Sequence, residues 1–161
     1  MNCLARTLLL TLIFVGVTHQ ASADLTAFIG SSRTPTPRVA KGIALSMSLL
    51  IVGFEFEYST VGENVESRTP SLQTGMFNIE AQAPPLVSGL QFYGTIGGGI
   101  YREQLMLEHQ EINVGTNMGG GVKLNLEGPI GIRLDYRIFR LAGNPLNNTS
   151  QRVYIGLNVG F

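Results

Sequence analysis

Residues 151–161, Gln-Arg-Val-Tyr-Ile-Gly-Leu-Asn-Val-Gly-Phe, alternate strictly between apolar side chains and small or polar ones. A period of two places successive side chains on opposite faces of a β-strand. The apolar face would consist of Val153, Ile155, Leu157, Val159 and Phe161. In a soluble sandwich this face meets a second sheet, whereas in a membrane barrel it meets lipid and the polar face lines the interior. The rest of the chain has to decide between the two.

The first 23 residues have the three-part layout of a secretory signal peptide. A short basic region ends at Arg6, an apolar run covers residues 8–17, and Ala21-Ser22-Ala23 supplies small residues before the expected cleavage site. The run is too short to cross a bilayer as a helix, which takes about 20 apolar residues. We expect a signal peptide over residues 1–23 and one mature domain over residues 24–161.

The composition of the mature chain excludes several classes of protein. The single cysteine, Cys3, lies within the expected signal peptide, so disulfides and thiolate chemistry are excluded. Without Arg6 the chain keeps ten basic and eleven acidic side chains, and this balance does not favour nucleic acid as a partner. No apolar run after Ala23 could form a transmembrane helix. An exported chain of this kind can enter a membrane only as a barrel.

Alternation of the same kind recurs along the chain and predicts eight strands. Most would run about 8 to 13 residues, against the roughly 9 to 11 that a tilted strand needs to cross a bilayer. We expect short turns after the second, fourth and sixth strands and longer polar loops, 33–38, 61–71, 102–111 and 144–148, at the other end. The sequence therefore predicts an all-β fold, an eight-stranded antiparallel up-and-down transmembrane β-barrel with both termini on the periplasmic side. The predicted strands cover residues 25–31, 42–49, 52–59, 72–82, 89–101, 112–126, 130–141 and 151–161.

Seven charged residues occupy the faces opposite the apolar ones on their own strands. They are Glu55, Glu57, Lys123, Arg133, Asp135, Arg137 and Arg152. An eight-stranded barrel is just wide enough for side chains to fill it, and an unpaired charge in such an interior costs several kcal/mol. We therefore expect a packed polar lumen in which the three arginines form ion pairs with Glu55, Glu57 or Asp135. An acid–base or ion-conducting site is less favoured, because carboxylates beside arginine stay ionised.

Other candidate sites are weaker. His109 lies among Glu103, Glu108 and Glu111, but a metal site there would have one imidazole in a solvated loop. A serine esterase would need a serine beside His109, and no G-x-S-x-G motif occurs. The triplets 97–99 and 119–121 are not phosphate loops, and we expect these glycines to permit bends and close strand approach. We expect no catalytic, cofactor-binding or metal-ligating residues and no cofactor.

Several stretches together resemble the small outer-membrane β-barrels of the OmpA-like porin superfamily. They are residues 53–58 (Gly-Phe-Glu-Phe-Glu-Tyr), 97–102 (Gly-Gly-Gly-Ile-Tyr-Arg), 119–123 (Gly-Gly-Gly-Val-Lys), 134–137 (Leu-Asp-Tyr-Arg) and the terminal Phe161. The resemblance implies a monomer in the outer membrane of a Gram-negative bacterium, inserted by the barrel-assembly machinery through the strand that ends at Phe161. The chain departs from the family in lacking both a peptidoglycan-binding domain after the barrel and any tryptophan.

Three functions remain open. The first is a structural or surface-interaction role through the extracellular loops. The second is a lipid-modifying enzyme that uses His109 or the interior carboxylates. The third is an exported soluble barrel that binds a small apolar ligand, with its apolar faces turned inward and its charged faces exposed.

Overall fold

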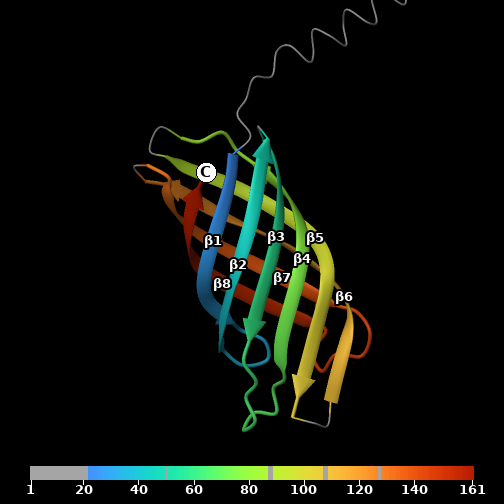
Figure 1. Ribbon diagram of the computed structural model, residues 1–161. Helices are drawn as coiled ribbons and strands as arrows, with labels where there is room; N and C mark the ends of the chain where they lie inside the picture. Colours follow the sequence, from blue (N-terminus) through green and yellow to red (C-terminus); the bar gives the residue numbers. More distant parts are fainter. Residues whose placement is uncertain (1–21, 50, 87–88, 107–108, 127) are drawn as a thin grey trace, which may run out of the picture.

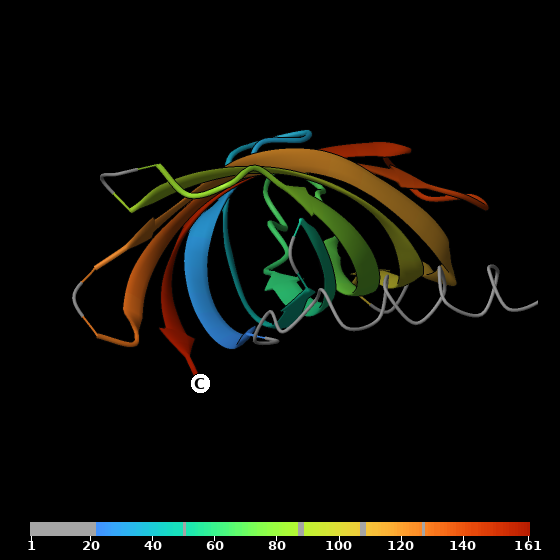
Figure 2. The same cartoon turned by 90° about the horizontal axis from the view of Figure 1, so that it is seen from above.

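A computed structural model describes residues 22–49, 51–86, 89–106, 109–126 and 128–161, which form one closed barrel of eight antiparallel strands (Figure 1). Each strand pairs with its neighbour in the sequence, and β1 pairs with β8 to close the wall. Seen from above, the strands curve around a common interior (Figure 2). The fold predicted from the sequence is confirmed. The strands are β1 (Ser22–Ser32), β2 (Arg38–Leu49), β3 (Val52–Val61), β4 (Ser71–Gln82), β5 (Leu90–Leu105), β6 (His109–Asn125), β7 (Ile130–Leu141) and β8 (Thr149–Gly160).

The two ends of the chain meet where the barrel closes. Phe161 donates its backbone N–H to the carbonyl of Ala23 (2.8 Å) and accepts a bond from the N–H of Ala23 (3.2 Å). We call this the termini end of the barrel and the opposite end the loop end. The expected signal peptide lies largely outside the described residues, whereas Ser22 and Ala23 are the first residues of β1.

Strand positions agree with the sequence expectation most closely for β7, which covers the predicted residues 130–141. The predicted loop 102–111 is wrong, because β5 continues to Leu105 and β6 begins at His109, with Glu103 paired to Glu111. The alternation does continue here, with Tyr101 and Glu103 facing inward. The hydropathy pattern does not show this alternation, because the outward residues Arg102 and Gln104 are polar.

The predicted contrast in loop lengths holds only in part. The connections after β2 and β6 are short, but the connection after β4 covers residues 83–89 and is as long as residues 142–148 at the loop end. Pro84 and Pro85 have no backbone N–H and cannot extend the ladder. The chain instead turns through Gly89 at a φ of 75°, with the N–H of Leu86 bonded to the carbonyl of Leu90 (2.8 Å).

The outward faces of the strands are apolar and the inward faces are buried. Leu157 is 55% exposed and its neighbour Asn158 is 7% exposed, and the same contrast runs around the wall. Gly97 and Gly99 confirm the expected close approach, since a Cβ at either would collide with the backbone of β4. Among the described residues there is no helix long and apolar enough to cross a membrane.

Candidate functional site

The interior of the barrel holds a network of nine charged side chains, each no more than 7% exposed. All seven charges that the alternation assigned to the lumen lie there. Two further members, Asp24 and Glu80, were missed. Glu80 alternates with the outward Ile79 and Phe77, and Asp24 directly precedes the outward Leu25, so the same pattern would have found both. The network comprises Asp24, Glu55, Glu57, Glu80, Lys123, Arg133, Asp135, Arg137 and Arg152.

Arg133 is the centre of this network. Its guanidinium lies 2.5 Å from Glu55 Oε2, 2.7 Å from Glu80 Oε1 and 3.3 Å from Asp135 Oδ2. Its Nε donates to the hydroxyl of Tyr93 (2.7 Å), which itself donates to Asp135. One planar cation thus connects carboxylates from β3, β4 and β7 across the whole bore. The fork of five N–H donors makes arginine suited to this role.

Arg137 and Arg152 extend the network toward the loop end. Arg137 lies 2.7 Å from Glu55 Oε1, 3.0 Å from Asp135 Oδ1 and 3.1 Å from Glu57 Oε2. Arg152 lies 2.5 Å from Glu57 Oε1. The predicted ion pairs of all three arginines are therefore confirmed.

Lys123 anchors the termini end of the network. Its Nζ lies 3.1 Å from Glu80 Oε2 and 3.4 Å from Asp24 Oδ2. The four cations thus face five carboxylates, instead of the three that the sequence suggested. Each of the five carboxylates has at least one cation within ion-pair distance.

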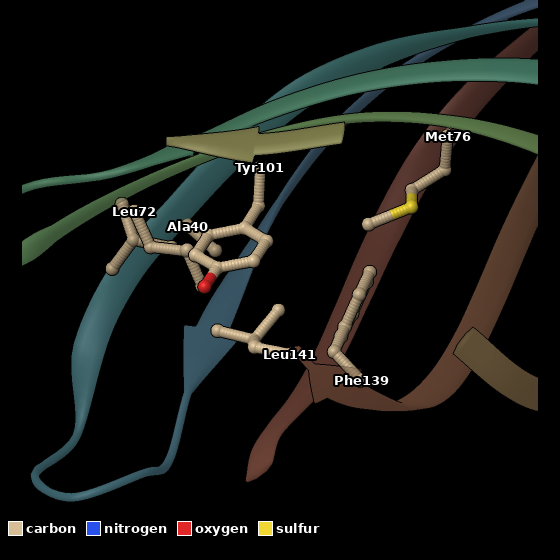
Figure 3. Packing of buried hydrophobic residues seen from close by; sticks show 7 residues of the cluster. Ala40, Leu72, Met76, Tyr101, Phe139 and Leu141 are labelled. Carbon is tan, nitrogen blue, oxygen red and sulfur yellow. The ribbon is translucent and has the colours of Figure 1, made fainter. Parts of the chain in front are cut away.

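Aromatic rings separate the charges from an apolar cluster at the loop end. The Phe28 and Tyr154 rings stack at 4.1 Å, and the Arg152 guanidinium lies 5.0 Å from the Phe28 centroid and 4.7 Å from that of Phe139. Beyond Phe139 the bore is filled by side chains from β2, β3, β4, β5 and β7 that point toward one another (Figure 3). The apolar cluster comprises Ala40, Val61, Leu72, Met76, Tyr101, Phe139 and Leu141.

His109 lies at the outer rim, on β6, instead of in the predicted loop. Its Nε2 is 3.5 Å from Glu103 Oε2, and the Glu103 carboxylate also accepts the backbone N–H of Leu146 (2.8 Å). Burial raises the pKa of Glu103 above its usual range. Glu111 instead accepts bonds from Asn113 and the backbone N–H of Asn144. Glu108 lies outside the described residues, and within those residues no three His, Cys, Asp or Glu side chains form a group that could hold a metal ion.

The site as a whole compensates charge and fills space. Each buried carboxylate lies within ion-pair distance of an arginine or lysine side chain. Ion pairs fill the lumen toward the termini end, and the apolar cluster fills it toward the loop end. An aqueous path along the axis would have to displace both.

No protein-family model and no curated protein sequence matches the chain. Solved structures do. Neisserial surface protein A is 14% identical, with 88% of this chain and 97% of that one covered and a TM-score of 0.73. This chain has the fold of the small eight-stranded outer-membrane barrels. The N-terminal β-barrel domain of Pseudomonas aeruginosa OprF is 17% identical over 88% of this chain and 100% of that one (TM-score 0.66). The outer-membrane enzyme PagL is 10% identical over 84% of this chain and 98% of that one (TM-score 0.53).

Proposed function

We propose that this chain is a non-enzymatic barrel of the bacterial outer membrane, with a closed lumen and with its loop end on the cell surface. The observation that carries the proposal is the sidedness of the wall. Apolar side chains cover the outside and the charged network is buried inside, as in barrels whose wall faces lipid. A soluble barrel that binds an apolar ligand would need the reverse arrangement. The solved structures with this fold support the same location.

A closed lumen leaves the loop end as the surface that contacts the surroundings. It consists of the connections 33–37, 62–70 and 142–148 together with the outer part of the β5–β6 hairpin. Arg38 holds two of these connections together, since its guanidinium donates to the carbonyls of Thr34 and Gly62 at 3.3 and 2.8 Å. The proposed role is therefore structural or one of surface interaction through a braced loop surface.

Conductance tests the closed lumen. Purified wild-type protein in planar bilayers is expected to show no stable open channel, because the arginine network and the apolar cluster both fill the bore. An open porin measured in the same bilayers is the positive control. A reproducible conductance of the wild-type protein would overturn the closed lumen and favour a transport function.

The route of insertion is a second part of the proposal. We expect the barrel-assembly machinery to recognise the β8 strand through Phe161, whose side chain is 76% exposed, and the inserted protein to be a monomer. Deleting Phe161 should leave the protein in the periplasm and degraded, while Phe161→Tyr should insert normally. Normal outer-membrane levels of the deletion variant would show that Phe161 is not the signal.

One observation favours an enzyme as the second candidate. The Glu103 carboxylate lies beside the His109 imidazole, as a carboxylate that orients a catalytic histidine would. The fold is also shared with an outer-membrane enzyme. If the pair were catalytic, His109→Ala would change the lipid A produced by cells that express the protein. We expect mass spectrometry of lipid A to show no change.

A further inference from the structure

The outer wall is not smooth along β5, β6 and β7. Three adjoining hollows of about 450, 400 and 560 Å³ follow these strands. The first two share Ile96, Met118 and Ile138, and the last two share Thr116 and Arg140. Together they form one groove, which we call the wall groove. Each hollow is within the roughly 300–1,000 Å³ of small-molecule sites.

The groove exists because two outward positions of β5 have no side chain. Gly94 and Gly98 line it on either side of the larger Ile96, and Ile100 is the next outward position. A Cβ at Gly94 or Gly98 would meet only ordinary contacts, 3.9 and 3.5 Å from backbone oxygens of β6. Close strand approach therefore does not require glycine at these two positions. Their effect is the hollow itself.

A cation, Arg140, lies where the second and third hollows meet. On β7 the outward positions from Ile130 to Ile138 are apolar or aromatic over nine residues, about the length that crosses a bilayer, and Arg140 follows. Arg140 is exposed, and among the described residues none forms a hydrogen bond or ion pair with its side chain. It lies in register with Thr116 on β6 and Thr149 on β8, both exposed. The apolar outward stretch of β7 thus ends at a cation that lies between two threonines.

We infer that the wall groove binds an acyl chain of a lipid whose phosphate group is held by Arg140. This rests on the proposed function, because the wall must face lipid. Arginine matches phosphate with a bidentate fork, and basic groups at the membrane surface attract anionic headgroups. Thr116, which lines the same two hollows as Arg140, supplies a hydroxyl donor for the same phosphate.

Charge disfavours a second copy of the chain as the occupant. The outward positions of the described strands hold the cations Lys41, Arg102 and Arg140 but no Asp or Glu. A partner wall of the same sequence would therefore offer Arg140 no carboxylate. A lipid phosphate supplies the missing anion and an apolar chain in one molecule.

The test is lipid retention by the purified protein in phosphatidylcholine nanodiscs, measured by native mass spectrometry after release from the disc. The probes are dioleoyl phosphatidic acid and dioleoylglycerol, which share their chains and differ in the phosphate. The wild-type protein should retain one phosphatidic acid in preference to dioleoylglycerol. Arg140→Gln should weaken phosphatidic acid binding about five-fold, the effect of about one surface cation. Lys41→Gln, the control on the far strand β2, should leave it unchanged.

A second variant tests the apolar part of the groove. Gly94→Leu adds a side chain in the hollow that Arg140 does not line, where the backbone leaves room, so the barrel should fold while retention of both lipids falls. Equal effects of Arg140→Gln and Lys41→Gln would reduce the site to general surface attraction and overturn the inference. So would equal retention of the two lipids by the wild-type protein, or a stable dimer that releases no lipid. Failure of the wild-type protein to insert into the nanodiscs would instead overturn the proposed function itself.

Discussion

The two halves of the lumen are filled by opposite chemistry. Toward the termini end, the bore is occupied by Arg133 and the three carboxylates that surround it. Toward the loop end, Met76, Phe139 and Leu141 form a core like that of a soluble protein. Arg152 lies at the boundary, with its guanidinium paired to Glu57 and lying close to the aromatic rings. Both fillings close the barrel, but they should respond differently to substitution.

The difference follows from how each filling is stabilised. Apolar packing is graded, since the loss scales with the volume removed. A buried charge network responds more abruptly, because removing one cation leaves an excess of negative charge in a medium where uncompensated charge is costly. The charged half should therefore be the less tolerant half, although its net contribution to stability is smaller than its number of contacts suggests.

The largest expected effect is that of Arg133→Met. It leaves Glu55, Glu80 and Asp135 without their shared cation, and we expect a loss of about 3–5 kcal/mol in the free energy of unfolding. Urea unfolding of the protein in lipid vesicles measures this loss. Circular dichroism follows the unfolding, because the chain has no tryptophan for fluorescence. Met76→Leu in the apolar half is the control and should cost less than about 1.5 kcal/mol. Similar costs for the two variants would remove the contrast between the halves.

The next effect tests whether charge is tolerated only inside. Leu157→Arg places a cation on the outer wall and should cost about 2–4 kcal/mol near mid-membrane. Asn158→Ser, one residue further on the buried face, should cost much less. The same unfolding measurement in vesicles decides it. If Asn158→Ser proved the more damaging change, the faces of β8 would be exchanged.

Two tyrosines of the lumen separate a bonded hydroxyl from one without a partner. Tyr93 accepts from Arg133 and donates to Asp135, so Tyr93→Phe should cost about 1–3 kcal/mol. Among the described residues the Tyr154 hydroxyl has no hydrogen-bond partner, so Tyr154→Phe should be close to neutral. Thermal unfolding in detergent compares the two variants. Because both variants keep the ring, equal losses would mean that the hydrogen bonds of the Tyr93 hydroxyl add nothing to stability beyond what the Tyr154 hydroxyl contributes.

The smallest effect concerns the rim above the apolar half. Burial raises the pKa of Glu103, so folding favours its protonated form, and this contribution is present at low pH and lost as pH rises through the raised pKa. The unfolding midpoint of the wild-type protein relative to Glu103→Gln should therefore fall slightly as pH rises above the ordinary glutamate pKa of about 4.3. Glu111→Gln is the control. Hydrogen bonds from Asn113 and Asn144 lower the pKa of Glu111. The unfolding midpoint of the wild-type protein relative to Glu111→Gln should therefore rise with pH instead of falling.

Much of this architecture could be read from alternation alone. The apolar positions of β3 and β7 predicted which side chains face out, and the charges between them were assigned correctly to the lumen. Alternation failed to predict strand where the outward-facing residues are polar. Arg102 and Gln104 occupy outward positions, so the outer part of the β5–β6 hairpin, residues 102–111, was interpreted as a loop.

By itself the sequence determined the eight strands, the sidedness of the wall and the need for buried charges to be paired, because side-chain direction in a strand is a local property with a period of two. Only the tertiary structure decided which partners meet. Register and closure bring Glu80 of β4 to Arg133 of β7, and place Gly98, Thr116 and Arg140 side by side on three strands. Those contacts depend on how strands far apart in the chain are aligned, and no local pattern specifies that alignment.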